Sequence, residues 1–403
     1  MERRTFLRDA LGSTLALSAL APASTIAAEG EASAKSEPLL QGAPVVTGPA
    51  AESLTILQAV RRPATGYLEL QGKADSWQRI DAESAGLLPY DHHVLKFRLP
   101  PLPAGQEIRY RVTATPVDFQ NAYKILPGEA TTSETHSVRT LNPDAAETKF
   151  VIWNDTHENL PTIQSLVAAT EKLRPDFLLW NGDQTNDIYD EAKMGNQYLA
   201  PNGLTVAAEW PLAYTRGNHD VRGPAARSLS RFTGTPEDRF YYAFRSGPLA
   251  ALVMDTGEDK TDDHPVFGGL AAFRAMRDRQ TAWLAKAIEE PWFAAAPHKV
   301  LFCHIPLWWT TEEQSENGPW TFSRVCRDAW LPLLRKGGIK LVVSGHTHDA
   351  KWLPAAEGRP IPQLIGGGPK PQGATIIGGT ATKERLTLTM SRLDGSILET
   401  VNL

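Results

Sequence analysis

The chain has 403 residues and a formal net charge of −5, with 42% hydrophobic and 22% charged residues. This length predicts two or three folding units, and the composition is that of a globular protein rather than a disordered, collagenous or multi-spanning membrane chain. The charge is small and no Lys/Arg run follows the first residues, so neither a nucleic-acid-binding face nor a polybasic membrane patch is indicated.

Residues 1–34 have the pattern of an export signal. Arg3 and Arg4 precede a weakly apolar stretch at 10–23, which is typical of a twin-arginine signal peptide. The alternative is an ordinary N-terminal helix or a short anchor, but the stretch is shorter than the roughly 20 apolar residues of a membrane span. We therefore expect export to the periplasm or the medium, a linker at 35–43, and no membrane span once the signal is removed.

Residues 44–142 have the pattern of a small β domain. Short runs of alternating residues are separated by turns rich in Pro and Gly, as in β-sandwiches. The main runs are 54–60, 67–70, 93–99 and 108–113. We expect an all-β sandwich in this part of the chain.

From 148 to 403, apolar runs alternate with amphipathic helices, which predicts a layered α/β domain. The expected strands are 150–153, 177–180, 212–214, 249–254, 299–302 and 340–343. Apolar residues at helical spacing predict helices over 163–170 and 273–287. Four further β runs, expected to complete the sheet layers, are 361–365, 374–377, 386–390 and 397–401.

Polar motifs follow five of these strands directly. They are Asn154-Asp155-Thr156-His157, Asn181-Gly182-Asp183, Gly217-Asn218-His219-Asp220, His304 and Gly345-His346-Thr347-His348. Open α/β sheets place their sites at the carboxyl ends of their strands, so we expect these side chains to meet at one edge. Each motif alone is more often a turn, a cap or an isolated histidine, but five in this order predict a metal site.

The donor types indicate which metals would bind. Asp, Asn and His side chains offer oxygen and nitrogen without thiolate, a set that suits Zn, Mn, Fe or Co. In Asp-x-His and His-x-His turns the two outer side chains can converge on one cation, and a neighbouring Gly lets the backbone approach it. Neither a P-loop nor a Gly-x-Ser-x-Gly elbow occurs in the sequence.

These motifs, over about 149–352, resemble those of the calcineurin-like metallophosphoesterases. Separately, the segment 93–99, followed by Pro103-Ala104-Gly105 and Tyr110-Arg111-Val112, resembles a fibronectin type III-like sandwich and is similar to the β domain of purple acid phosphatases. The family resemblance implies a four-layer α/β/β/α catalytic domain with two metal ions. By motif it assigns Asp155, His157 and His348 to the first metal, Asn218, His304 and His346 to the second, and Asp183 to both.

The resemblance also implies hydrolysis of phosphate esters through in-line attack by a metal-bridging hydroxide. His219 would face the phosphate as general acid or electrostatic stabiliser. The expected substrate is a small-molecule, lipid or nucleotide phosphate ester, either a monoester or a diester. The alternative is an inactive metal-binding protein that attaches to a polymer or the cell envelope, which the intact ligand set argues against.

One position departs from the relatives. Asn186 stands where purple acid phosphatases have a metal-binding Tyr and protein Ser/Thr phosphatases have an Asp that orients the catalytic His. Asp187 and Asp220 are the remaining candidates to orient His219. Asn186 therefore argues against assigning the chain either to the purple acid phosphatases or to the protein Ser/Thr phosphatases.

Other residues near the motifs have two interpretations each. Arg216 and Arg222 flank the Gly-Asn-His-Asp turn and are candidate phosphate clamps, although solvation or pairing with carboxylates is the alternative. Cys303 and Cys326 are too few for a disulfide-stapled scaffold, and buried thiols are expected rather than a bridge. Two roles are open for Trp308, Trp309 and Trp320: they form an aromatic wall over the metals, or they pack between the β domain and the catalytic domain.

Overall fold

The computed structural model describes residues 37–50, 53–72, 76–313 and 318–403. Residues 38–403 form one compact unit. The expected signal peptide at 1–34 lies outside the described residues, as does the beginning of the expected linker. In the described part of the chain no helix has the length and apolarity that a membrane crossing requires.

The N-terminal part is a sandwich of two sheets, as the alternating runs predict. One side holds β1 (Val45–Thr47), β2 (Thr55–Ala59) and β6 (Val94–Arg98). The facing sheet has β3 (Ala64–Gln71), β4 (Trp77–Ile80), β7 (Glu107–Asn121) and β10 (His136–Arg139), with β5 (Tyr90–Asp91), β8 (Lys124–Pro127) and β9 (Thr131–Thr132) beside them. Between the two sheets lie buried apolar residues from both, including Ile56, Phe97, Leu68, Tyr110 and Val112.

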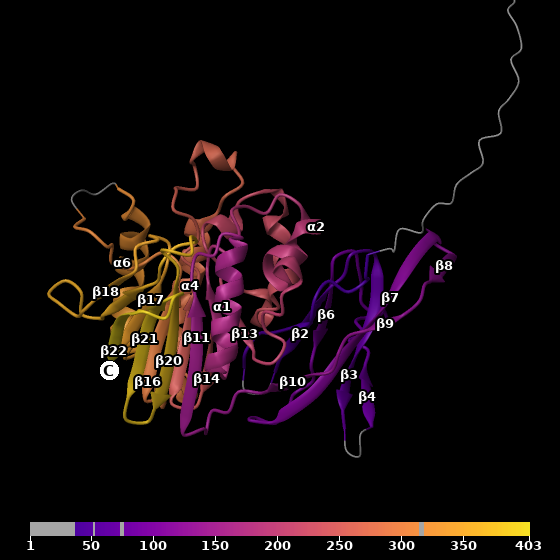
Figure 1. Cartoon of the computed structure of the whole chain (residues 1–403). Helices are drawn as coiled ribbons and strands as arrows, with labels where there is room; N and C mark the ends of the chain where they lie inside the picture. The colour runs from indigo at the N-terminus through magenta and orange to yellow at the C-terminus, as the bar shows by residue number, and fades with distance from the viewer. Residues whose placement is uncertain (1–36, 51–52, 73–75, 314–317) are drawn as a thin grey trace, which may run out of the picture. The chain divides into compact units, whose positions relative to one another are not determined.

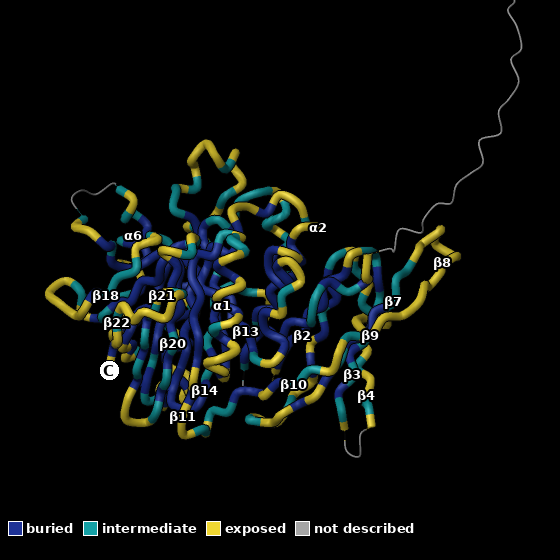
Figure 2. The backbone as a smooth tube through the Cα atoms, viewed as in Figure 1, coloured by how far each residue is buried: buried dark blue, intermediate teal, exposed yellow. Residues whose placement is uncertain are grey.

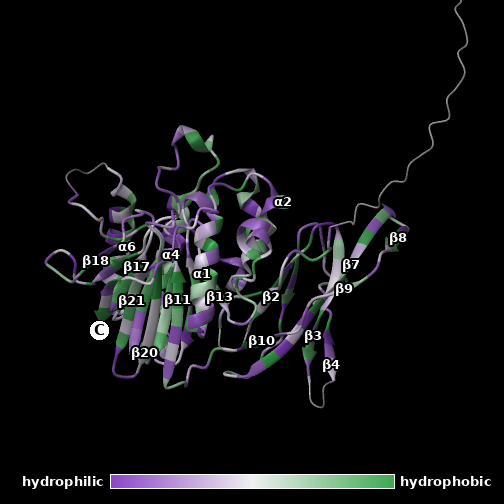
Figure 3. Ribbon diagram, in the orientation of Figure 1, coloured by the Kyte–Doolittle hydropathy of each residue, from purple (hydrophilic) through white to green (hydrophobic). Residues whose placement is uncertain are grey.

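The hairpin of β7 and β8 extends beyond this core. Strand β8 is exposed along its whole length, and Figure 2 draws the hairpin largely as exposed. Figure 3 colours parts of the hairpin as hydrophobic, and Tyr123 is 100% exposed. The first half of β7 supplies Tyr110 and Val112 to the sandwich core, whereas the exposed end of the hairpin contributes little to it.

The larger α/β part contains two further strand layers. The first sheet runs β22 (Ile397–Asn402), β21 (Leu386–Arg392), β20 (Thr375–Thr382), β11 (Glu147–Trp153), β12 (Phe177–Asn181) and β13 (Leu212–Thr215). The second runs β14 (Tyr242–Ser246), β15 (Leu249–Met254), β16 (His298–Cys303), β17 (Leu341–Ser344), β19 (Gln363–Ile365) and β18 (Lys351–Leu353). Most of these strands coincide with the apolar runs of the sequence.

The first sheet continues into the N-terminal sandwich, which the sequence did not indicate. Strand β1 pairs in parallel with β13, with Thr47 opposite Leu212, and β2 and β6 follow β1 in the same sheet. The hydroxyl of Tyr110 in the facing sheet donates to the carbonyl of Ala208, at 2.8 Å. Backbone pairing and a buried hydrogen bond thus join the sandwich to the α/β part.

Helices cover the outer faces of the two α/β sheets. Helix α1 (Leu160–Leu173) packs on the first sheet, and Figure 1 shows it lying along the strands. Helices α4 (Phe273–Ala287) and α6 (Thr321–Lys336) pack on the second. The shorter helices are α2 (Glu191–Met194), α3 (Leu229–Thr233) and α5 (Pro291–Ala294). The inner faces of both sheets share one buried cluster that includes Phe150, Phe177, Val253 and Phe302, so the expected α/β/β/α layering is confirmed.

Helix α6 and strand β14 are among the elements that the sequence did not predict. Helix α6 buries Phe322, Cys326, Trp330 and Leu334 at four-residue spacing, and β14 pairs antiparallel with β15. Cys303 and Cys326 are both buried free thiols.

Candidate metal centre

The five polar motifs all meet beyond the carboxyl ends of the central strands. Asp155 and His157 follow β11, Asp183 follows β12, and Asn218 and His219 follow β13 in the first sheet. His304 follows β16 directly, and His346 and His348 follow β17 in the second sheet. In the first sheet β12 pairs in parallel with both β11 and β13, and in the second sheet β16 pairs in parallel with both β15 and β17, which brings these ends together.

The backbone at these turns adopts an uncommon conformation. Asp155, His157, Asp183, His346 and His348 have φ between 43° and 70°, so five of the seven expected ligands lie in the left-handed region. Non-glycine residues rarely occupy it, and such strain concentrates at functional sites. Tertiary contacts must hold these turns in place.

Three overlapping sets of donors lie close enough to share a cation. In each set the candidate atoms are within 4.8 Å of one another, and the sets are Asp155, His157 and His348; His157, Asp183 and His219; and Asp183, His304 and His346. The first and third sets correspond to the two groups expected from the motifs. Asn218 is absent from them because the sets contain only His, Asp, Glu and Cys side chains. The second set brings His219 near the donors as well.

The first set surrounds the Nε2 atoms of two histidines. Nε2 of His157 is 3.1 Å from Nε2 of His348, and the latter atom is 3.5 Å from Oδ1 of Asp155. Two ring nitrogens and a carboxylate oxygen therefore point to one small volume.

The amide of Asn218 lies beside the third set. Nδ1 of His346 is 2.9 Å from Oδ1 of Asn218, and Nε2 of His304 is 3.1 Å from Oδ2 of Asp183. The same Oδ2 atom is 3.5 Å from Nε2 of His157 in the other set. Asp183 is thus placed between the two groups of donors.

Three motif glycines make room for these side chains. A Cβ on Gly182 would lie 2.2 Å from the ring of His304, one on Gly217 would lie 2.2 Å from the carboxylate of Asp183, and one on Gly345 would lie 2.2 Å from that of Asp155. Each motif's glycine therefore packs under a donor supplied by another motif. Gly366 and Gly368 pack in the same way against Asn154 and His348.

The charges at the site fit a bound cation. Asp155 and Asp183 are almost completely buried, and buried carboxylates need compensating charge. Burial alone would lower the pKa of His304, but the charges of Asp183 and Asp155 outweigh it and raise that pKa to about 10. Nε2 of His304 is buried without a hydrogen-bond partner, and its Nδ1–H donates to the carbonyl of Asn181 at 3.0 Å. A ring fixed through Nδ1, with Nε2 turned toward two carboxylates, is the arrangement of a metal-ligating histidine.

His219 is held in place by two backbone contacts. Its N–H donates to Oδ1 of Asp183 at 2.9 Å, and its Nδ1–H donates to the carbonyl of Asn186 at 2.8 Å. The suggestion that Asp220 orients this ring is not supported, because the Asp220 carboxylate accepts from the N–H groups of Asp183 and Gly217 and from the hydroxyl of Tyr198. Asp220 instead fixes the two turns that carry the donors.

The two candidate arginines differ in what they contact. Arg216 pairs with the buried carboxylate of Asp255 and stacks on Phe240, 4.4 Å from the ring centroid, which favours the carboxylate-pairing interpretation. Arg222 also pairs with a buried carboxylate, that of Glu258, but its Nη1 is 3.1 Å from Nε2 of His219. Arg222 therefore contacts a residue of the site.

Trp308 and Trp309 also differ in what they contact. Trp308 is buried, and its Nε1–H donates to the carbonyl of Gly358 at 3.0 Å, as a packing residue would. Trp309 meets the ring of His346 edge-on, with the centroids 5.7 Å apart. Trp309 therefore belongs to the wall of the site.

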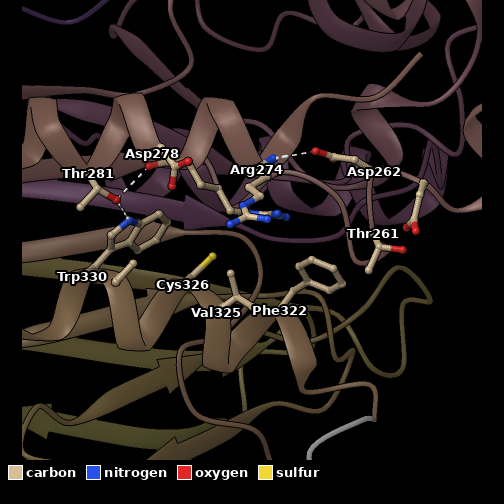
Figure 4. A pocket seen from close by; sticks show the side chains of 12 residues that line it. Thr261, Asp262, Arg274, Asp278, Thr281, Phe322, Val325, Cys326 and Trp330 are labelled. Carbon is tan, nitrogen blue, oxygen red and sulfur yellow. Dashed lines mark hydrogen bonds between the residues drawn. The ribbon is translucent and has the colours of Figure 1, made fainter. Parts of the chain in front are cut away.

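A pocket of about 510 Å³ lies elsewhere, between α4 and α6, and contains none of the expected ligands. Figure 4 shows Phe322, Val325 and Cys326 on one side of it and Arg274 on the other. Buried Arg277 lines it too, and donates to the carbonyls of Thr256 and Glu258. The pocket thus touches the segment whose Glu258 carboxylate holds Arg222.

Comparison with known proteins shows the family. Residues 148–350 match the model of the calcineurin-like phosphoesterase family, which is half of the chain. The chain belongs to this family. The matched region contains every expected ligand, and the family, the fold and the clustered donors together support a metal-dependent phosphoester hydrolase.

Individual relatives of this phosphoesterase are distant. It is 24% identical over 170 residues to the proteins named serine/threonine-protein phosphatase CPPED1 of Homo sapiens and Pongo abelii. The match covers 42% of this chain and 48% of each relative, so the chain spans about half the length of these curated relatives.

Two solved structures share the fold over 89% of the chain. They are purple acid phosphatase PPD1 from yellow lupin (Lupinus luteus), with a TM-score of 0.64, 13% identity and 73% of that chain covered, and PhoD, with a TM-score of 0.59, 11% identity and 92% covered. Because the matches extend beyond the family region, the similarity in fold includes the N-terminal β-rich part.

Proposed function

We propose that this phosphoesterase is exported, binds two metal ions and hydrolyses phosphate esters. The observation that carries the proposal is the position of Asp183, whose Oδ2 atom lies within 3.5 Å of Nε2 of both His157 and His304. One carboxylate faces both sets of donors, as a bridging ligand of a dinuclear centre must.

The donors divide into two groups around this carboxylate. Asp155, His157 and His348 would hold one ion, and Asn218, His304 and His346 the other. The ions, drawn from Mn, Fe, Zn and Co by donor type, would lower the pKa of a water and offset phosphoryl charge when bound. His219 and Arg222 stand together beside the donors, where a ring nitrogen and a guanidinium can contact phosphate oxygens or the leaving group.

Metal dependence is the first test. Metal-free protein should be inactive and should recover with Mn, Zn, Fe or Co, and turnover of p-nitrophenyl phosphate against its bis ester will show whether monoesters or diesters are preferred. Asp183→Asn should abolish recovery, while Asp144→Asn, the same change at an exposed residue outside the motifs, should not. Full turnover by protein shown to contain no metal would refute the proposal.

Export is tested separately. The double variant Arg3→Lys with Arg4→Lys should retain the precursor in the cytoplasm, because the paired arginines are the feature that the transport receptor reads. Arg8→Lys in the same segment is the matched control and should be exported normally. Unchanged export of the double variant, measured by cell fractionation, would contradict the twin-arginine route but not the hydrolase.

A further inference from the structure

We infer that Asn186 is a positioning residue that fixes the rings of two histidines with different tasks, His157 through its side chain and His219 through its backbone. The inference rests on the proposed metal-dependent function. It concerns the position where the chain departs from purple acid phosphatases and protein Ser/Thr phosphatases.

The side chain of Asn186 acts on His157. Nδ1 of His157 is 3.2 Å from Oδ1 of Asn186, and the amide Nδ2 donates to the carbonyl of His157 at 3.3 Å. The second contact fixes which end of the amide is the oxygen, because a carbonyl can only accept. The ring must then carry its proton on Nδ1 to donate to Oδ1, which leaves the lone pair on Nε2.

That lone pair points to the donors of the first set. Nε2 of His157 is 3.1 Å from Nε2 of His348 and 3.5 Å from Oδ2 of Asp183. A metal ligand must present a bare nitrogen, and a partner on the other ring nitrogen fixes both the tautomer and the orientation of the ring. Asn186 provides this partner without adding a charge beside the buried carboxylates.

The backbone of Asn186 acts on His219. Its carbonyl accepts from Nδ1–H of His219 at 2.8 Å, so Nε2 of His219 is left to face Arg222 and the substrate side. Because the acceptor is a main-chain group, substitution of the Asn186 side chain leaves it in place. The two functions of the residue are therefore separable by mutation.

The loop is held from beneath by Glu158. Its Oε2 accepts from the hydroxyl of Thr185 at 2.8 Å and from the N–H of Asn186 at 3.3 Å, and its Oε1 accepts from the amide of Gln197 at 3.0 Å. Together with the contacts to His157 and His219, the bond to Glu158 means that the N–H, the carbonyl and both side-chain polar atoms of Asn186 have partners. Asn186 is nevertheless exposed, so water competes for the contacts of its amide. The loss of metal affinity on removing these contacts should therefore lie at the lower end of the roughly 10–100-fold range for outer partners of a ligand.

The test is titration of metal-free protein with Mn or Zn by calorimetry. Asn186→Ala and Asn186→Leu should weaken binding at one of the two sites by about tenfold, within the 10–100-fold range for outer partners of a ligand. Asn186→Asp, which keeps an acceptor, should retain affinity. Asn142→Ala, which removes a remote amide that accepts from the N–H of Asp144, is the control and should change nothing.

Nitrogen NMR of ¹⁵N-labelled histidines separates positioning from general destabilisation. In the Ala and Leu variants His157 should lose its fixed Nδ1–H form, while His219 should keep it. Unchanged affinity at both sites in these variants, or an unchanged His157 tautomer, would overturn the inference. Failure of the unmodified protein to bind any metal would instead overturn the proposed function, and this inference with it.

Discussion

At the scale of single residues, Asn218 and His219 are adjacent but face different tasks. The amide oxygen of Asn218 lies 2.9 Å from Nδ1 of His346, within the group that would hold the second ion. His219 lies close to Asp183 and His157, yet its Nδ1 is taken by the carbonyl of Asn186. We therefore keep Asn218 as a ligand and His219 as a group that acts on the phosphate or the leaving oxygen.

Substitution of each residue distinguishes these tasks. Asn218→Ala should lower the occupancy of one metal site and turnover together. His219→Ala should keep both metals and reduce turnover by about 10²- to 10⁴-fold, the scale of one general acid or one preorganised donor. Metal content by elemental analysis and kcat for each variant are the measurements.

The leaving group tells which role His219 has. If it is a general acid, the loss should be smaller for p-nitrophenyl esters, whose leaving group departs without a proton, and large for alkyl phosphates. If it stabilises phosphoryl charge, both substrates should lose equally. Loss of a metal ion from His219→Ala would show that it is a ligand, as its place in the second donor set allows.

At the scale of elements, the segment after β15 connects α4 to the site. Arg277 of α4 is buried and donates to the carbonyls of Thr256, at 2.9 Å, and Glu258, at 2.6 Å. Glu258 in turn accepts from Nε of Arg222 at 2.8 Å, and Arg222 reaches His219. A helix in the outer layer thereby fixes the guanidinium of Arg222 at the site.

Arg277→Met should loosen this segment. It removes two hydrogen bonds from a charged donor, each worth about 1.5 to 3 kcal/mol, and should lower both the free energy of unfolding and kcat while metal content stays normal. Arg279→Met, at an exposed position of the same helix, is the control, and an exposed substitution should stay within about 0.5 kcal/mol. Urea unfolding and steady-state kinetics measure the two effects, and full activity of Arg277→Met would argue against the connection.

At the scale of the whole molecule, the centre joins the two α/β sheets. Asp155 and Asp183 come from the first sheet, and His304, His346 and His348 from the second. Burial raises the pKa of Asp183, but the charge of His304 and neighbouring histidines outweighs burial and holds it well below its usual value. Cations at this junction would neutralise buried carboxylates that belong to opposite layers.

Metal should therefore stabilise the folded chain. Binding to the native state alone contributes about 4 kcal/mol at a metal concentration 1,000 times Kd, so metal-free protein should unfold at a lower temperature than metal-loaded protein. Asp183→Ala should lose most of this difference, since it lacks the carboxylate that faces both groups. Equal melting temperatures with and without metal would contradict the placement of the cations at the sheet junction.

The sequence by itself determined most strands of the α/β part and the donors that follow them, although not β14 or β18. The run 249–254 coincides with β15 (Leu249–Met254), and the stripe of 273–287 with α4 (Phe273–Ala287), because burial on both faces makes such strands apolar and packing on one face gives helices their period. The motif order also placed each donor at the carboxyl end of a strand, since parallel strands end together, but the expectation of a single sheet edge was wrong because the donors follow strands of two sheets. Local pattern is sufficient for such features.

Only the tertiary structure decided how distant segments complete the site. The left-handed turns of Asp155 and His346, the carbonyl of Asn186 beside His219, and the pairing of β1 with β13 depend on residues far apart in the chain. A backbone carbonyl leaves no trace in the sequence, so no motif marked Asn186 as the partner of His219. The same holds for Arg222. The sequence did not predict its ion pair with the carboxylate of Glu258, which lies 36 residues later in the chain.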